Sequence, residues 1–196
     1  MQFSFNIFLI VFSLGAAQAL VLSLLILLRR PQKRHSYYIG FMLLIFSLGS
    51  LKIILQEIQP GFLDDFRFPL VYQFASGPLL YLFVKSLLYK ETQPLRKVTL
   101  HFIPVLLIDV AYRSGFHRFG FRNSDSIIQI INFSTNIAAT VSYIIYALLA
   151  LRVWYRYRTN AVRKPTVATQ RALFWSKAMI LVDVASTGAS VVYILL

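Results

Sequence analysis

The sequence predicts an all-α integral membrane protein, a polytopic bundle of about six transmembrane helices in a single domain over residues 1–196. The composition is 58% hydrophobic and only 14% charged, which is too apolar for a soluble domain of this size. Several apolar runs reach the roughly 20 residues that a helix needs to cross a bilayer. The spans are predicted at residues 5–28, 37–55, 69–89, 98–112, 127–151 and 172–196.

The first span, residues 5–28, is predicted to remain in the protein as a transmembrane helix. No basic residue precedes Phe3, and the apolar run is longer than that of a cleaved signal peptide. Three small residues at four-residue spacing, Gly15, Ala19 and Ser23, form one stripe on this helix. Because small side chains let helix backbones approach closely in a membrane, we expect the stripe to face another helix.

The third span, residues 69–89, contains the dipeptide Gly77–Pro78 inside an apolar run. Proline has no N–H to donate to the carbonyl of Phe74, and its ring crowds that turn. We therefore predict that the helix kinks or restarts at this dipeptide. Lys85 lies near the opposite end of the span, where a long side chain reaches the headgroups, so we interpret it as an anchor.

The fourth span, residues 98–112, opens with HFIPVLL, which places His101 near the interface and Pro104 in the first turns of a short helix. Asp109 in this span and Asp183 in the sixth both lie about 15 to 17 Å from the cytoplasmic side, at ~1.5 Å per residue. Carboxylates inside a membrane are costly and usually point into the bundle. A structural and a functional role both stay open for this pair.

The fifth span has a polar stripe on its outer half. Its members follow one another at steps of 3, 4, 4 and 3, which is one face of a helix: Gln129, Asn132, Asn136, Thr140 and Tyr143. A polar stripe facing lipid is unfavourable, so the stripe faces protein or water. Hydrogen bonding between helices is one interpretation, and a cavity lined for a ligand or water is the other.

The charge distribution predicts the topology. Most of the 20 Lys and Arg residues lie in or next to alternate loops, the first, third and fifth. Cytoplasmic loops carry the Lys and Arg excess, so we place the N-terminus outside and the first, third and fifth connections in the cytoplasm. The last apolar run, SVVYILL, has no polar flank, and we expect a seventh span and a cytoplasmic domain to follow it.

Three segments resemble a known family. They are LGAAQALVLSLLILLRR, GPLLYLFVKSLL and HFIPVLL, within residues 14–107, and they are similar to the membrane-embedded N-terminal region of AraC-type bacterial transcriptional regulators. The resemblance implies a multi-pass sensor or anchoring domain in a bacterial cytoplasmic (inner) membrane, which passes a signal to a cytoplasmic helix-turn-helix domain. No helix-turn-helix is present in these 196 residues, so DNA would be bound only by a C-terminal part missing from this chain.

The expected partners are the lipid bilayer, a second copy of the chain in a homodimer, and a small-molecule or lipid signal. A fragment of a transporter or channel is the alternative, with the polar stripe, the two acids and Gly77–Pro78 lining a path. An enzyme is disfavoured because no catalytic pair is suggested and the three histidines lack HxxxH spacing. We expect no cofactor and no metal; the absence of cysteine excludes disulfides and thiolate metal sites.

Overall fold

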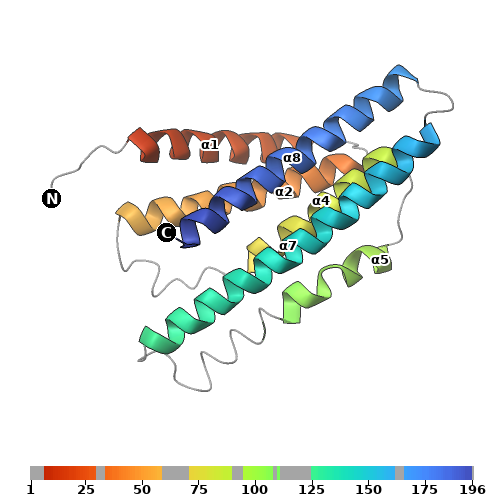
Figure 1. Ribbon diagram of the computed structural model, residues 1–196. Helices are drawn as coiled ribbons and strands as arrows, with labels where there is room; N and C mark the ends of the chain where they lie inside the picture. The colour runs from red at the N-terminus through yellow and green to blue at the C-terminus, as the bar shows by residue number, and fades with distance from the viewer. Residues whose placement is uncertain are drawn as a thin grey trace.

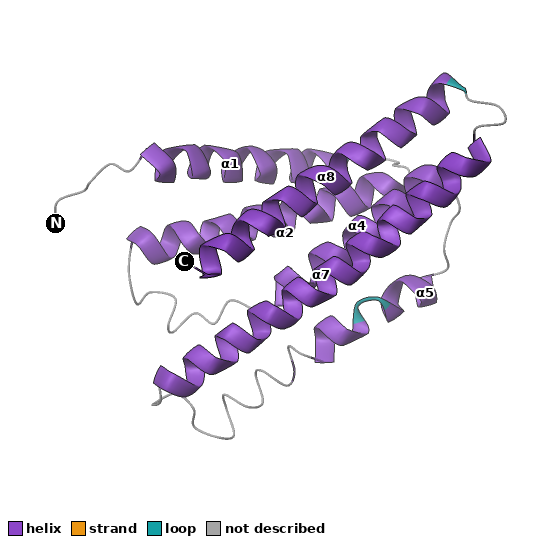
Figure 2. Ribbon diagram, viewed as in Figure 1, coloured by secondary structure: helices purple, strands orange, loops and turns teal. Residues whose placement is uncertain are grey.

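The computed structural model describes residues 7–29, 34–58, 71–89, 95–107, 110, 125–161 and 166–195. Its elements are helices, and the described ranges contain no strand, which confirms the all-α prediction (Figure 2). The helices are α1 (Ile7–Leu28), α2 (Arg34–Ile58), α4 (Val71–Tyr89), α5 (Leu95–Leu100), α7 (Asp125–Ala161) and α8 (Val167–Leu195) (Figure 1).

Helix α4 is the centre of the bundle. It contacts α2, α7 and α8, while α1 packs against the far side of α2 (Figure 1). Its side chains are buried at consecutive positions, so the helix is enclosed on all its faces, as a helix that is apolar all round should be. The buried residues include Leu79, Leu80, Leu82, Phe83 and Val84.

Outside the central helix α4, many large apolar side chains point outward, while small side chains lie at the helix contacts. On α1, Leu14 and Leu25 are 60% and 61% exposed, whereas Ala16 and Ala19 on the opposite side are buried. The serines of the helix interfaces are buried as well, and Ser23 and Ser176 have no exposed surface. Water-soluble bundles distribute these residue types the other way round, with large apolar residues inside.

One helical stretch among the described residues, Phe133–Asn160, is long and apolar enough to cross a membrane. Only 22% of its most apolar window is buried inside the bundle, whereas the core helix of a soluble protein would be mostly buried. Three shorter apolar stretches, Ser13–Leu28, His35–Leu51 and Phe74–Tyr89, lie in α1, α2 and α4. The arrangement of six spans stays a prediction.

Helices α1 and α2 pack through small residues and two hydrogen bonds. The Ser47 hydroxyl donates to the Ala16 carbonyl at 2.9 Å, and the Ser23 hydroxyl donates to the Gly40 carbonyl at 2.8 Å. A Cβ added at Gly15 would meet nothing within 4 Å, so that residue takes no part in a close contact. Ala19 and Ser23 of the predicted stripe are buried, and Ala16 lies beside them at the contact with α2. Gly15 makes no close contact within this chain, and its role between two copies of the chain stays a prediction.

The chain remains helical through Gly77–Pro78, because α4 is one helix from Val71 to Tyr89 with Pro78 inside it. The helix therefore does not restart at this dipeptide, while a kink there stays a prediction. Pro78 is among the fully buried side chains, and Gly77 lies against α7. In a membrane helix, packed neighbours can stabilise the turn that a proline disturbs.

The chain leaves the helix at a different proline. Helix α5 ends at Leu100, His101 and Phe102 form a turn, and helix resumes over residues 103–107. The amides of His101 and Phe102 donate to carbonyls three residues earlier, at 3.1 and 2.9 Å, which is the tighter turn typical of a helix end. Pro104 has no N–H for the carbonyl of Leu100, which explains the position of the break. The predicted fourth span is thus not one continuous helix.

Candidate functional site

Four polar or aromatic side chains from three helices meet on one side of α4, and we call them the His101 cluster. They are Tyr81 and Lys85 of α4, His101 in the turn after α5, and Tyr146 of α7. The ring centroids of Tyr81 and His101 are 5.4 Å apart, those of His101 and Tyr146 5.7 Å, and those of Tyr81 and Tyr146 6.2 Å. These separations are within the range of direct contact between aromatic rings.

The contact between His101 and Tyr146 is polar as well as aromatic. The Tyr146 hydroxyl lies 3.3 Å from His101 Nδ1 and donates to the His101 carbonyl oxygen at 3.5 Å. Both distances are longer than the optimum for a hydroxyl, which is about 2.7 to 2.8 Å. The pair is therefore held weakly, and a small movement of α5 relative to α7 is enough to make or break it.

Lys85 completes the cluster from the turn of α4 below Tyr81. Its ammonium group donates to the Tyr81 hydroxyl at 3.4 Å and lies 5.6 Å from the centre of the Tyr81 ring. Residues four apart on a helix share one face, so α4 itself brings this pair together. The Lys85 side chain is half-buried, so the interpretation as a simple anchor at the headgroups omits its contact with Tyr81.

The turn after α5 orients His101. Because the helix stops at Leu100, the His101 carbonyl is directed to the Tyr146 hydroxyl of another helix. Below the turn, Val105 is buried against Phe74 of α4 and Ala139 of α7, with Phe102 beside them. These apolar contacts hold the segment that carries His101 against α4 and α7.

Gly77 sets the distance between α4 and α7 next to the cluster. A Cβ at this position would lie 3.2 Å from the Tyr143 Cα and 3.2 Å from Cβ and Cδ2 of Tyr146. Such contacts are tighter than ordinary van der Waals separation, and the Tyr143 Cα is backbone that cannot turn away. Glycine is therefore needed for the close approach that brings Tyr146 to Tyr81 and His101.

Helix α7 also connects the cluster to α8. About two turns after Tyr146, the Trp154 indole N–H donates to the Leu173 carbonyl of α8 at 3.1 Å. The Arg158 guanidinium lies 5.4 Å from the centre of the Trp154 ring, and the rings of Tyr89 and Tyr157 meet edge to face. A displacement of α7 at Tyr146 would thus be transmitted to α8 through Trp154.

The chemistry available to the cluster is polar recognition. It offers one ammonium group, one imidazole and two phenolic hydroxyls in a half-buried position. Such a set can bind an anionic or hydrogen-bonding group, or change its contacts when the imidazole changes protonation state. Within the described ranges, no three or more His, Cys, Asp or Glu side chains gather in a group that could hold a metal ion.

The inner end of the predicted polar stripe packs against α4. Tyr143 is buried in the core shared with Leu80, Phe83 and Val84, and its backbone faces Gly77. This contact brings together two predicted site residues from different helices. It is a packing contact, and both interpretations of the stripe, hydrogen bonding between helices and a polar cavity, stay predictions.

The middle of the stripe is half-buried. The Thr140 hydroxyl donates to the Asn136 carbonyl of the same helix at 2.9 Å, a bond within α7 and not between helices. The side chains of Gln129, Asn132 and Asp183 are outside the description, although their backbones lie in α7 and α8. Asp109 lies outside the described residues altogether. The polar interior cavity along the stripe and the shared plane of the carboxylates Asp109 and Asp183 therefore stay predictions.

Sequence reasoning missed most of the His101 cluster. Tyr81 and Tyr146 were not singled out, because each is one aromatic residue within a long apolar helix. The signal that was available is the position of His101 three residues before Pro104: a proline-induced end of a helix leaves polar backbone groups near a polar side chain. Which helices supply the partners of His101 depends on packing and cannot be read from spacing.

No family model, curated protein or solved structure matches the chain.

Proposed function

We propose that this chain is a membrane-embedded sensing or anchoring domain of a one-component transcriptional regulator. The proposal that the domain lies in a membrane rests on one observation, the outward position of many large apolar side chains. Leu148 on α7, Val182 on α8 and Leu107 after α5 are 60%, 67% and 64% exposed. A hydrocarbon environment would cover these side chains, whereas exposed apolar patches of this extent are unusual on soluble proteins.

Helix lengths support more than one span. Helices α1, α2, α7 and α8 have 22, 25, 37 and 29 residues. Each exceeds the roughly 20 residues needed to cross the hydrocarbon layer. The buried central helix α4, with 19 residues, is close to that length. We propose the six-span arrangement with the N-terminus outside, in which the broken α5 segment is the shortest span.

The sensing part of the proposal rests on the His101 cluster. Helices α4 and α7 and the turn after α5 meet there through long polar contacts. Helix α7 is also joined to α8 by the hydrogen bond from the Trp154 indole to the Leu173 carbonyl. A ligand or a proton that changed the contact between His101 and Tyr146 would shift α5 against α7 and then α8. A helix shift of this kind is a known mode of signal transfer between sites. The signal is a small polar molecule or a lipid headgroup.

The regulatory part of the proposal comes from the resemblance to AraC-type regulators. In that arrangement a seventh span would follow α8 and lead to a cytoplasmic helix-turn-helix domain, and DNA would be bound only there. A homodimer suits such a regulator because dimeric helix-turn-helix proteins bind two half-sites at a fixed spacing. The helix bundle would then set the distance or orientation between two DNA-binding domains.

A transporter fragment is supported by one observation, the interruption of α5 at His101. Broken helices in transporters usually recur at corresponding positions in both halves. The last helix, α8, is instead continuous from Val167 to Leu195. The helix break therefore has no described counterpart in the second half of the chain, and the sensing domain remains the better proposal.

Membrane embedding is tested by single cysteines, for which the cysteine-free chain is a clean background. In intact cells, Gln32→Cys and Thr166→Cys should be protected from a membrane-impermeant thiol reagent, while Ser124→Cys should be labelled. Permeabilised cells are the control, since all three sites should then react. Labelling of the first two sites in intact cells would show that the orientation is the opposite of the proposed one. Extraction of the protein by alkaline carbonate would refute membrane embedding.

Sensing is tested by measuring transcripts in the natural host with the complete reading frame that contains this chain. The variant His101→Ala should alter the set of regulated transcripts while membrane abundance stays equal to wild type. His35→Ala, in the N-terminal turn of α2, is the matched histidine control and should leave the transcripts unchanged. Equal transcript profiles for the wild type and both variants, at equal abundance, would refute the role of the cluster.

A further inference from the structure

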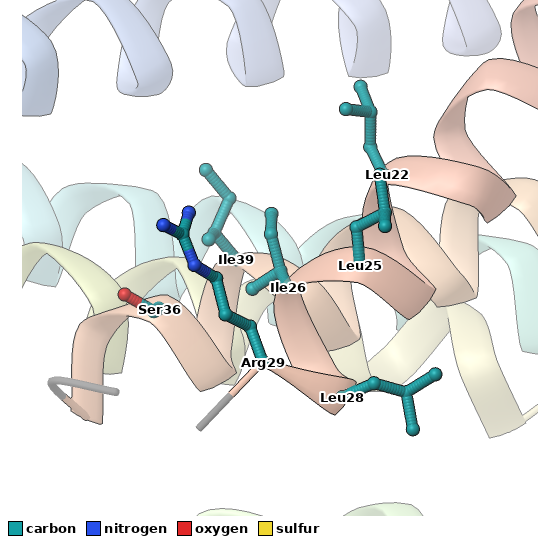
Figure 3. Close-up of a pocket in the computed structure, with 7 residues that line it drawn as sticks. All are labelled: Leu22, Leu25, Ile26, Leu28, Arg29, Ser36 and Ile39. Carbon is teal, nitrogen blue, oxygen red and sulfur yellow. The ribbon is translucent and has the colours of Figure 1, made fainter. Parts of the chain in front are cut away.

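A groove lies between the C-terminal end of α1 and the first turns of α2, away from the His101 cluster. It has a volume of about 700 Å³, which is the size of a site for a small molecule or part of a lipid. Its lining is apolar along most of its length and polar at one end (Figure 3). The apolar residues used below are Leu22, Leu25, Ile26 and Ile39, and the polar ones are Arg29 and Ser36.

Helices α1 and α2 are in close contact beside the groove. The Ser23 hydroxyl donates to the Gly40 carbonyl at 2.8 Å. A Cβ at Gly40 would lie 2.9 Å from Leu27 Cδ2 and 3.2 Å from Ile26 Cγ2. The lack of a side chain at Gly40 thus determines how near Ile26, which lines the groove, lies to α2.

The polar end of the groove is suited to an anion. The Arg29 side chain extends from the end of α1 toward Ser36 and Ile39 of α2 (Figure 3). A guanidinium group binds phosphate with two parallel hydrogen bonds, and a serine hydroxyl supplies a further donor. Positive charge next to an apolar groove is complementary to a ligand with an anionic head and a hydrocarbon tail.

The apolar part is suited to that tail. Leu22 and Leu25 are 51% and 61% exposed, and with Ile26 they follow α1 for about one turn toward Arg29. We propose that this groove binds one anionic phospholipid, with its phosphate at Arg29 and Ser36 and an acyl chain on Leu22, Leu25 and Ile26. The site rests on the membrane embedding proposed above, but it is independent of the His101 cluster and of transcriptional control.

The headgroup contact is tested with the purified full chain in phosphatidylcholine nanodiscs, to which phosphatidylglycerol is added. Bound lipid is counted by native mass spectrometry after release from the nanodiscs. Arg29→Gln should lower the affinity for phosphatidylglycerol about fivefold, as expected for the loss of one basic contact to an anionic lipid. Arg29→Lys should retain part of the affinity for phosphatidylglycerol, because the lysine keeps the positive charge. Arg152→Gln, at an exposed arginine on α7, is the matched control and should bind as wild type does.

The tail contact is tested by two pairs of substitutions on α1. Leu22→Ser with Leu25→Ser should reduce retention of phosphatidylglycerol, whereas Leu14→Ser with Val21→Ser, at exposed residues outside the groove, should not. Soluble glycerol 3-phosphate should fail to displace the lipid. If that compound displaces the lipid, the ligand of the groove is a free phosphate compound and not a phospholipid. If both serine pairs retain phosphatidylglycerol equally, the groove is not the site of the acyl chain.

Two outcomes separate this inference from the proposed membrane embedding. If carbonate extracts the wild-type chain from membranes, both proposals fail. If the chain stays in the membrane but Arg29→Gln binds phosphatidylglycerol as tightly as wild type, or loses no more than Arg152→Gln does, then only the lipid site fails.

Discussion

Two prolines in apolar helices have opposite outcomes in this protein. The chain remains helical through Pro78 in α4, whereas it leaves the helix just before Pro104 and forms a turn at His101 and Phe102. Each proline removes the same donor from the backbone. Pro78 is fully buried among α2, α7 and α8, whereas Pro104 is exposed at the edge of the bundle.

The difference shows that packing decides what a proline does to a membrane-type helix. Around Pro78, neighbouring helices pack against α4. The missing side chain at Gly77 lets α7 lie in direct contact with the α4 backbone. Around Pro104, the segment is held mainly by Phe102 and Val105, so the turn before the proline is free to open. The open turn then supplies the carbonyl and the imidazole of His101 to the candidate site. The predictions below test this contrast, from the largest expected effect to the smallest.

Gly77→Leu should have the largest effect. The new side chain would clash with the Tyr143 backbone and with Tyr146, which are 3.2 Å from the position of a Cβ. Overpacking of this kind costs about 1 to 3 kcal/mol, so the melting temperature in detergent should fall by about 5 to 10 °C. The matched control is Gly15→Ala, where a Cβ meets nothing within 4 Å and the melting temperature should not fall. Equal losses in both variants would contradict the close approach of α4 and α7.

The two prolines are compared directly by Pro78→Ala and Pro104→Ala. Removing the buried ring of Pro78 leaves a cavity in the core, and the hydrogen bond that the alanine N–H gains offsets this only in part. We expect Pro78→Ala to lower the free energy of unfolding by about 1 kcal/mol while the protein still inserts into the membrane.

Pro104→Ala should act in the opposite direction because its ring is exposed. It restores the donor for the Leu100 carbonyl and should close the turn at His101. Hydrogen exchange at the amides of residues 101–106 should become slower, whereas Pro78→Ala should leave those amides unchanged. An unchanged exchange rate in Pro104→Ala would show that packing of Phe102 and Val105, and not the proline, opens the turn.

A double-mutant cycle measures the contact that the open turn allows. His101→Ala removes the imidazole and Tyr146→Phe removes the hydroxyl, which lies 3.3 Å from His101 Nδ1, whereas the carbonyl of residue 101, 3.5 Å from the hydroxyl, is present in both. Because these bonds are long, the coupling energy in thermal or chemical unfolding should be only about 0.5 kcal/mol. In the Pro104→Ala background the coupling should vanish, since closing the turn moves His101. A coupling that persists there would contradict the role of the break in placing His101.

Thr140→Val should have the smallest effect. The Thr140 hydroxyl donates to the Asn136 carbonyl of its own helix at 2.9 Å, so its loss breaks no contact between helices. The expected change in the free energy of unfolding is below about 0.5 kcal/mol, and membrane insertion should be unchanged.

Asn136→Leu is the companion test of the polar stripe. If the stripe recognises a signal, that variant should lose the response at normal abundance; if the stripe only packs, the response should follow the amount of folded protein.

The candidate site was predictable only in part, and its residues show why. Lys85, His101 and Pro104 stand out in the sequence as a charge, an imidazole and a proline in apolar surroundings. Tyr81 and Tyr146 have no such signal, because a tyrosine in an apolar helix most often serves packing or the interface. Their convergence on His101 requires α4 and α7 to approach closely at Gly77, and that approach is a property of the assembled bundle.

The sequence by itself determined the helical class and the approximate positions of the helices, since these follow from the length and periodicity of the apolar runs. It also marked Gly77, Pro78 and Pro104 as special backbone positions. Only the tertiary structure decided which proline interrupts a helix, and which small residues of α1, Ala16 rather than Gly15, face α2. The physical reason is that one missing hydrogen bond is worth about 1 kcal/mol, and packing against neighbouring helices outweighs it where neighbours are present.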